Sequence, residues 1–241
     1  SCQSSSGHEA HQTTPGRTPS RPGVPVVVQV CLRQKGQSSG PAAIMTDPDI
    51  QQLLDEIPLL YKARAFADAI ADARIFARLG ENLSVSERGL ARAYLDGLGF
   101  PEAEPATLGS WEEAADAAET LDIDPQGWEA EEMLRAGLVS RALEQLDEAA
   151  VETLLSYVAQ KAGEAAQDAV AYFSSLADLR DESLQNAAAG MMVQAANGAA
   201  LVILAGEDED EDDPHPFLAR WRLFARGRWP VGLAGTSYNI L

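Results

Sequence analysis

The chain has 241 residues, of which 46% are hydrophobic and 23% charged, and its formal net charge is −19. This length and hydrophobic content suffice for a sizeable core in one or two domains. A surface with such a negative excess repels phosphate backbones and acidic lipid headgroups, so the composition argues against nucleic-acid and membrane binding by the acidic part. The same charge is also typical of a surface that simply keeps a protein in solution.

Composition divides the chain into four segments. Residues 1–44 are rich in Ser, Gly, Pro, Gln and Thr, which predicts disorder. Helical patterning begins near Met45, so we hypothesise that Met45 is the natural start and that residues 1–44 are not native. Residues 45–206 contain 10 basic and 29 acidic residues and are predicted to form an acidic all-α domain. Residues 207–215 form an acidic linker, and residues 216–241 form a basic, aromatic C-terminal segment.

Start and stop signals divide the acidic domain into about eight helices with short connections. Asp47-Pro48 and Asp124-Pro125 each place an N-cap residue before a proline at the first helical position. Ser84-x-x-Glu87 and Ser110-x-x-Glu113 are capping boxes. A helical period that follows Pro58 is expected to end at Gly80, and two successive helices are expected over residues 140–163 and 164–176.

The predicted fold class is all-α, as an irregular multi-helix bundle. Paired helices with Ala at many facing positions leave an α-solenoid-like array of helical hairpins as the alternative, although no fixed repeat is evident. Residues 99–109 are predicted to be a loop. In the C-terminal segment, a further helix is expected to end at Gly227. The last residues form either an extended terminus or a small hairpin that turns at Gly235-Thr236.

The only two cysteines, Cys2 and Cys31, precede the acidic domain, so that domain holds no disulfide, and we expect a cytoplasmic protein. The uncharged stretch over residues 184–206 is interrupted by Gln and Asn and is dominated by Ala and Gly. We therefore interpret it as a buried helix and predict no association with a membrane.

The sequence offers little material for catalysis or for cofactors. It has no G-x-S-x-G elbow, no phosphate-binding P-loop and no dinucleotide fingerprint. His8 and His11 are one residue too close for the zinc helix motif. His215 stands beside the acidic run, where negative charge should favour its protonated form. We expect it to be a solvated linker residue, with a pH-sensitive hinge as the alternative. The sequence thus predicts no metal site and no cofactor.

The C-terminal segment combines arginines with aromatic residues, two types that are enriched at binding hot spots. It has three conceivable roles: docking on the acidic domain of the same chain, binding a partner protein, or binding nucleic acid. We favour the first, because opposite charges and aromatic side chains would meet within one chain. The candidate binding residues here are Arg220, Trp221, Arg222, Phe224, Arg226, Arg228 and Trp229.

We expect a non-enzymatic, cytosolic helical interaction protein of bacterial type, acting as an adaptor, chaperone-like protein or regulatory scaffold. Its partner should be a protein, expected to be basic. The alternative is an acidic inhibitor or immunity-type protein that blocks a basic toxin or nucleic-acid enzyme. Its first contacts would be Glu112, Glu113, Glu131 and Glu132. An enzyme with a carboxylate site assembled from distant helices is a third hypothesis.

Overall fold

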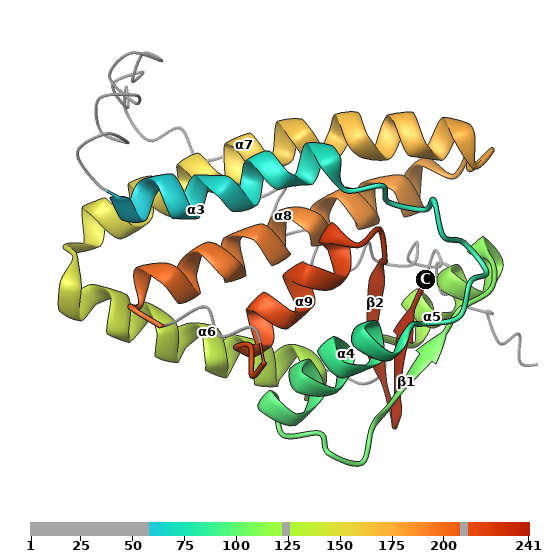
Figure 1. Ribbon diagram of the computed structural model, residues 1–241, viewed down its shortest axis with the longest axis horizontal. Helices are drawn as coiled ribbons and strands as arrows, with labels where there is room; N and C mark the ends of the chain where they lie inside the picture. Colours follow the sequence, from blue (N-terminus) through green and yellow to red (C-terminus); the bar gives the residue numbers. More distant parts are fainter. Residues whose placement is uncertain (1–57, 122–125, 208–211) are drawn as a thin grey trace, which may run out of the picture.

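The computed structural model describes residues 58–121, 126–207 and 212–241. These ranges form a mostly helical fold with a small three-stranded sheet (Figure 1). Its elements are α3 (Pro58–Asp68), the 3-10 helix η1 (Ala69–Asp72), α4 (Val85–Gly97), β1 (Glu104–Thr107), α5 (Trp111–Leu121), α6 (Gln126–Gln145), α7 (Glu148–Leu176), α8 (Glu182–Leu204), α9 (Pro216–Ala225), β2 (Pro230–Ala234) and β3 (Ser237–Ile240).

The predicted helical class is confirmed, but the prediction of an all-α fold omitted the sheet. Four sequence predictions lie outside the described residues: disorder over residues 1–44, a natural start at Met45, and the two helix starts at Asp47-Pro48 and Asp124-Pro125.

Helix α8 is the centre of the larger core. It packs against α7, α3, α9 and α6, and most of its side chains are buried (Figure 1). By length and composition α8 could cross a membrane, but 61% of its apolar window is buried inside the fold, as in the core helix of a soluble protein. The absence of a Cβ at Gly198 allows α9 to come close, because a Cβ there would lie 3.2 Å from the Phe217 ring.

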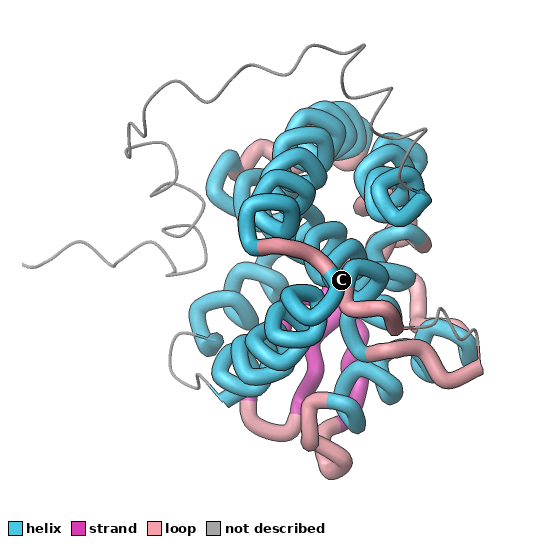
Figure 2. Tube along the Cα trace, turned by 90° about the vertical axis from the view of Figure 1, so that its left-hand side faces the viewer, coloured by secondary structure: helices cyan, strands magenta, loops and turns pink. Residues whose placement is uncertain are grey.

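The sheet has the order β1-β3-β2, so the last strand of the chain lies in the middle. Strand β3 pairs in parallel with β1 and antiparallel with β2, and the sheet lies against the helices in the end-on view (Figure 2). Strand β1 was predicted to be a loop. Glu104 donates its N–H to the carbonyl of Thr236, just before β3, and Leu108 donates to Ile240 in β3, which turns the nitrogen of Pro105 toward the open edge. A proline there leaves that edge without one of its donors.

A second, smaller core joins α4 and α9 to the sheet. Leu90 and Leu95 from α4 meet Leu223 from α9 and Ile240 from β3. Both halves of the predicted capping box at Ser84 are present and begin α4. The C-terminal hairpin, one of two alternatives for the end of the chain, forms between β2 and β3.

Three helix limits differ from the sequence prediction. The boundary expected just before Ser140 lies instead between Gln145 and Glu148, where the Asp147 side chain accepts the N–H of Ala150 and caps α7. The helix from Pro58 gives way to η1 at Ala69, and the chain then turns through Phe76 at a positive φ of 68° instead of continuing to Gly80. This turn buries Ile75 and Phe76 in the core, so tertiary packing overrides the local helical period. Helix α7 runs unbroken through Gly163, because a single glycine costs only about 1 kcal/mol in a helix that is held by tertiary contacts.

Candidate functional site

The basic, aromatic C-terminal segment is built into the core. Pro216 stands at the first position of α9, a place where its missing N–H costs nothing, and Gly227 follows the helix with a φ of +79°. Trp221 and Trp229 are both buried, and the indole N–H of Trp229 points at the sulfur of Met191 at 3.2 Å. The aromatic side chains therefore fill the interior of this fold.

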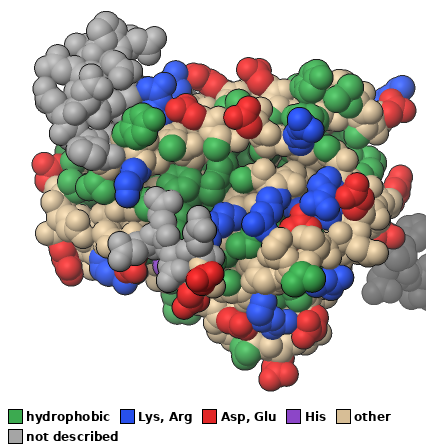
Figure 3. Space-filling view, in the orientation of Figure 1, with side chains coloured by type: hydrophobic (Ala, Val, Ile, Leu, Met, Phe, Trp, Pro, Cys, Tyr) green, Lys and Arg blue, Asp and Glu red, His purple; other side chains and the backbone are tan. Residues whose placement is uncertain are grey.

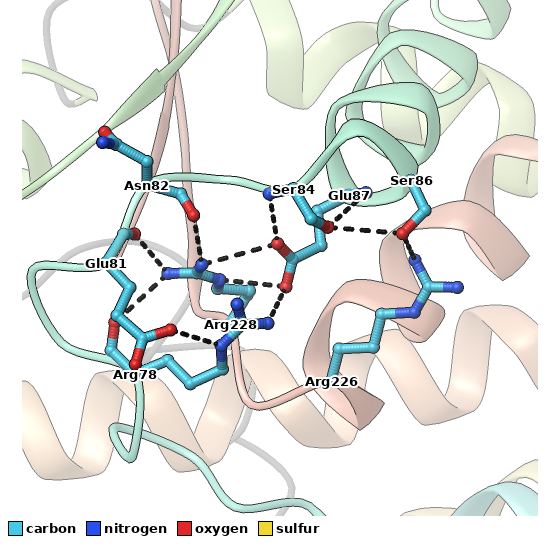
Figure 4. A network of polar contacts seen from close by, with 8 residues as sticks. All are labelled: Arg78, Glu81, Asn82, Ser84, Ser86, Glu87, Arg226 and Arg228. Atoms are coloured by element: carbon cyan, nitrogen blue, oxygen red, sulfur yellow. Dashed lines mark hydrogen bonds and ion pairs between the residues drawn. The ribbon is translucent and has the colours of Figure 1, made fainter.

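Arg228 holds the segment to the loop before α4 (Figure 4). Its Nε donates to Glu87 at 3.1 Å, and its terminal nitrogens donate to the backbone carbonyls of Arg78, Glu81 and Asn82 at 3.2, 2.8 and 2.9 Å. Buried charges are tolerated when they are paired and hydrogen-bonded in this way. The geometry thus makes Arg228 a structural residue.

Glu87 serves two structures at once. Its carboxylate accepts a hydrogen bond from the backbone N–H of Ser84 at 2.7 Å, which completes the capping box of α4. The same carboxylate accepts a hydrogen bond from the guanidinium of Arg78 at 2.5 Å, in addition to those from Arg228. Burial alone would raise the pKa of Glu87, but hydrogen bonds from Arg228 and Ser84 outweigh it and lower the pKa to about 2. The carboxylate is therefore charged throughout the physiological range.

A second ion pair, between the buried Arg220 and the partly buried Glu131, joins α9 to α6. Nη1 of Arg220 contacts both carboxylate oxygens of Glu131, at 2.8 and 2.7 Å, and the hydroxyl of Tyr94 also donates to Glu131. Burial raises the pKa of Tyr94 and of Tyr238, whose rings stack 5.0 Å apart. Within the described residues, the buried hydroxyl of Tyr238 has no hydrogen-bond partner.

The structure separates the sequence-predicted site residues into two groups. The first group is buried and therefore not accessible to a partner. It consists of Arg220, Trp221, Phe224, Arg228 and Trp229. Arg222 is half-buried, and Arg226 is exposed, with its guanidinium donating to Ser86 at 3.2 Å (Figure 4).

The four glutamates that were predicted to contact a basic partner also fall into two groups. Glu112 and Glu113 are exposed in the first turn of α5. Glu131 is committed to Arg220, and Glu132 pairs with Arg135 at 3.2 Å.

His215 differs from its predicted role as a solvated, protonated linker residue. It is the N-cap of α9, and its Nδ1 accepts the backbone N–H of Phe217 at 3.2 Å. Burial lowers the pKa of His215, against the opposing charge of Glu207. The negative charge of Glu207 favours the protonated form, as expected, but desolvation outweighs it, so the net pKa of His215 lies below its usual value.

Comparison with family models, curated proteins and solved structures finds no match for this chain. Among the described residues, no group of three or more His, Cys, Asp or Glu is placed to hold a metal ion.

An open groove of about 580 Å³ lies at the C-terminal end of α7. One wall is the last two turns of α7, and the other is the turn that follows η1. Its lining residues are Arg74, Phe76, Ala77, Tyr172, Phe173, Leu176 and Ala177. A volume of this size is within the range that binds a small ligand or a few side chains of a partner.

The α7 wall carries large apolar side chains in solvent. Tyr172 is 61% exposed and Leu176 is 67% exposed, and their four-residue spacing puts them on the same side of the helix. The Tyr172 ring meets Phe173 edge to face at 5.1 Å. We call Tyr172 and Leu176 the α7 ridge.

The opposite wall is held in a strained conformation. Phe76 has a φ of 68°, which a bulky residue adopts only when its surroundings enforce it. Its ring packs edge to face on Trp111 at 4.7 Å and on Trp229 at 6.2 Å. Gly227 abuts the same turn, since a Cβ there would lie 2.6 Å from the carbonyl oxygen of Arg74. The C-terminal segment thus fixes the shape of this wall.

Sequence reasoning missed the groove, although one wall left a signal. The buried residues of α7 recur at three- and four-residue steps through Val158, Ala162, Ala166 and Val170. Tyr172 lies two positions beyond Val170, on the other side of the helix. An aromatic residue off the core stripe could have been noted, but the wall facing it comes from a turn whose backbone no local pattern specifies.

Proposed function

We propose that the protein is a non-enzymatic helical interaction protein of the adaptor, chaperone-like or scaffold kind, and that the groove at the end of α7 contacts its protein partner. The observation that carries this proposal is the α7 ridge, where two large apolar side chains stand in solvent beside an open groove. Exposed apolar residues that gather at a concave site are typical of interfaces, whereas scattered ones need no explanation.

The rigidity of the groove supports the same proposal. Phe76 is wedged between Trp111 and Trp229, and the buried pair of Arg228 and Glu87 ties the C-terminal segment to the loop before α4. A surface that is fixed before binding loses less conformational entropy when a partner arrives. In this interpretation the C-terminal arginines and tryptophans act indirectly, by holding the binding surface in shape. The proposal also includes a cytosolic location, a bacterial origin, and an irregular bundle in place of a hairpin array.

The second candidate, an acidic inhibitor of a basic toxin or enzyme, is favoured by one observation. Glu112 and Glu113 are exposed at the start of α5, on a chain whose net charge is −19. Glu131 and Glu132 contribute less to such a surface because they are paired with Arg220 and Arg135. Under this candidate, Glu112→Gln with Glu113→Gln would weaken binding in a strongly salt-dependent way, and changes to the α7 ridge would not.

Site-specific photocrosslinking in the cells that make the protein tests the leading proposal. A benzophenone amino acid replaces Tyr172 in one variant and Tyr61 in the other. Tyr61 is a matched control because it lies on α3, outside the groove lining, and its exposed fraction is 69%, close to that of Tyr172. We expect one discrete crosslinked protein from position 172 and not from position 61.

The captured protein must then bind the purified chain, and Leu176→Ala must weaken that binding. Loss of a buried hot-spot side chain costs 1–2 kcal/mol or more, about 5- to 30-fold in Kd. Equal crosslinking at both positions, or binding that Leu176→Ala leaves unchanged, would show that the groove is not the contact surface.

A further inference from the structure

Arg74 is the one charged residue in the lining of the groove. It is exposed, and its guanidinium forms no hydrogen bond or ion pair with any described residue. This sets Arg74 apart from Arg78 and Arg228 on the adjoining segments, whose guanidinium groups are each bound to Glu87. An uncommitted cation among apolar walls is complementary to an anion that is attached to an apolar group.

The backbone of Arg74 is fixed although its side chain reaches solvent. Its carbonyl accepts the N–H of Ala77 at 3.1 Å and lies against Gly227. Asp178, which follows the lining residue Ala177, is already paired with Arg180 at 2.9 Å. The backbone that carries this cation is therefore held in place, and Arg74 lines the same groove as Phe76 and Phe173.

We propose that the groove selects a partner segment in which a carboxylate adjoins an aromatic or aliphatic side chain. The apolar side chain lies between the walls of Phe76 and Phe173, and the carboxylate pairs with Arg74. This inference rests on the proposed function, since it assigns chemistry to the same groove. A guanidinium can hold a carboxylate with two parallel hydrogen bonds, and the apolar surroundings strengthen that contact.

The charge of the whole chain limits this partner further. A net charge of −19 repels a strongly acidic protein at long range. On the face shown in Figure 3, however, basic side chains gather across the middle and acidic ones lie mostly toward the edges. The partner that fits both facts is basic or neutral overall and presents a single acidic residue next to its apolar anchor.

Two dyes that share a ring system separate charge recognition from apolar binding. 8-Anilinonaphthalene-1-sulfonate carries one anionic group, and N-phenyl-1-naphthylamine lacks it. Their affinities for the full-length chain are measured by fluorescence in low salt, for the wild type, Arg74→Met, Tyr172→Ala and Arg88→Met. Arg88 is the matched control, because it is an exposed arginine on α4 that lies outside the groove lining.

We expect the wild type to bind the sulfonate more tightly than the neutral dye. Arg74→Met should weaken binding of the sulfonate dye about fivefold or more and leave binding of the neutral dye unchanged. Tyr172→Ala should weaken binding of both dyes, and Arg88→Met should weaken binding of neither. If Arg74→Met has no effect on the sulfonate, the charge selection is wrong and the proposed binding function stands. If Tyr172→Ala affects neither dye, the groove binds nothing apolar and both proposals fail.

The source of the carboxylate is settled by two further measurements. The crosslinked peptide from position 172 is sequenced, and an Asp or Glu within one helical turn of its crosslinked residue supports the proposal. Decanoate, a free apolar carboxylate, is titrated against the bound sulfonate dye. Displacement at micromolar decanoate without any crosslinked protein would replace the partner segment by a small-molecule ligand and overturn the proposal.

Discussion

Glu87 and Arg228 lie 141 residues apart in the chain and bury their charges against each other. Each side chain is 1% exposed, and Nε of Arg228 lies 3.1 Å from Oε1 of Glu87. Because Glu87 is also the third residue of α4 and completes its capping box with Ser84, the start of this helix and the end of the chain share one carboxylate. The same pair braces the segment that carries Trp229, which in turn supports the groove wall at Phe76.

Removing either member of this pair should destabilise the fold strongly. We expect Arg228→Met to lower the free energy of unfolding by about 3–5 kcal/mol, because Glu87 would keep a buried and uncompensated charge. Combining it with Glu87→Leu should restore part of that loss. Urea unfolding followed by circular dichroism measures the stability of both variants. Arg64→Met, at an exposed pair with Asp68 at 3.2 Å, is the control and should change stability by less than about 1 kcal/mol. Similar values for Arg228→Met and Arg64→Met would contradict a structural role for the buried pair.

The low pKa of Glu87 predicts a specific loss of stability in acid. The pKa falls from 4.5 to about 2 on folding, so between these values the unfolded chain binds more protons than the folded one. The contribution of Glu87 to the free energy of unfolding, up to about 3 kcal/mol, is therefore fully present above about pH 5. It is lost as the pH falls toward 2. Urea midpoints between pH 2 and 6 should show the gap between the wild type and Glu87→Gln narrowing as pH falls. Parallel curves would mean that Glu87 does not carry this dependence.

How far the sequence predicts this structure depends on whether the deciding partner is local. The capping box at Ser84 was predictable, because its two members are three residues apart and satisfy each other. Strand β1 was not, since Pro105 is typical of a loop and the strand exists only because β3 supplies its hydrogen bonds from 133 residues further along the chain. The turn at Phe76 was missed for the same reason: distant Trp111 and Trp229 hold it.

The candidate site shows the same limit. Docking of the C-terminal segment on the acidic domain of the same chain was the favoured prediction, although its arginines were also named as candidate binding residues. In the structure Arg228 and Arg220 pair with Glu87 and Glu131, and the sequence did not identify these two carboxylates. The distribution of charged residues along the sequence shows that a basic segment follows an acidic domain. It does not show which carboxylates pair with the arginines in the folded chain. The groove combines a helix end with a strained turn, and only the three-dimensional fold brings them together.

The stacked pair of Tyr94 and Tyr238 gives a prediction with an internal control. The Tyr94 hydroxyl donates to Glu131, so Tyr94→Phe should cost about 1–3 kcal/mol by leaving that partly buried carboxylate one donor short. The Tyr238 hydroxyl is buried without a hydrogen-bond partner in the described residues, so Tyr238→Phe should be neutral or slightly stabilising. Thermal and urea unfolding of the two variants compare them directly. A clear loss of stability in Tyr238→Phe would reveal an ordered partner, such as a water molecule, at that hydroxyl.

Gly227 should be indispensable for the groove wall. Gly227→Ala introduces a side chain at a φ of +79° and places its Cβ 2.6 Å from the carbonyl oxygen of Arg74. Gly235 is the matched control, with a φ of +59° and no atom within 4 Å of an added Cβ. Left-handed backbone strain alone costs about 1–2 kcal/mol, so Gly235→Ala should lose about that amount and Gly227→Ala distinctly more.

The same variants test whether the C-terminal segment positions the groove. Because the Gly227 clash displaces Arg74, Gly227→Ala should weaken binding of 8-anilinonaphthalene-1-sulfonate under conditions where the variant is still folded by circular dichroism. Gly235→Ala should bind the dye as the wild type does, since its turn lies outside the groove lining. If both glycine variants lose stability equally, or if folded Gly227→Ala keeps full affinity for the dye, then the close contact between Gly227 and Arg74 does not control the wall, and the C-terminal segment serves the core alone.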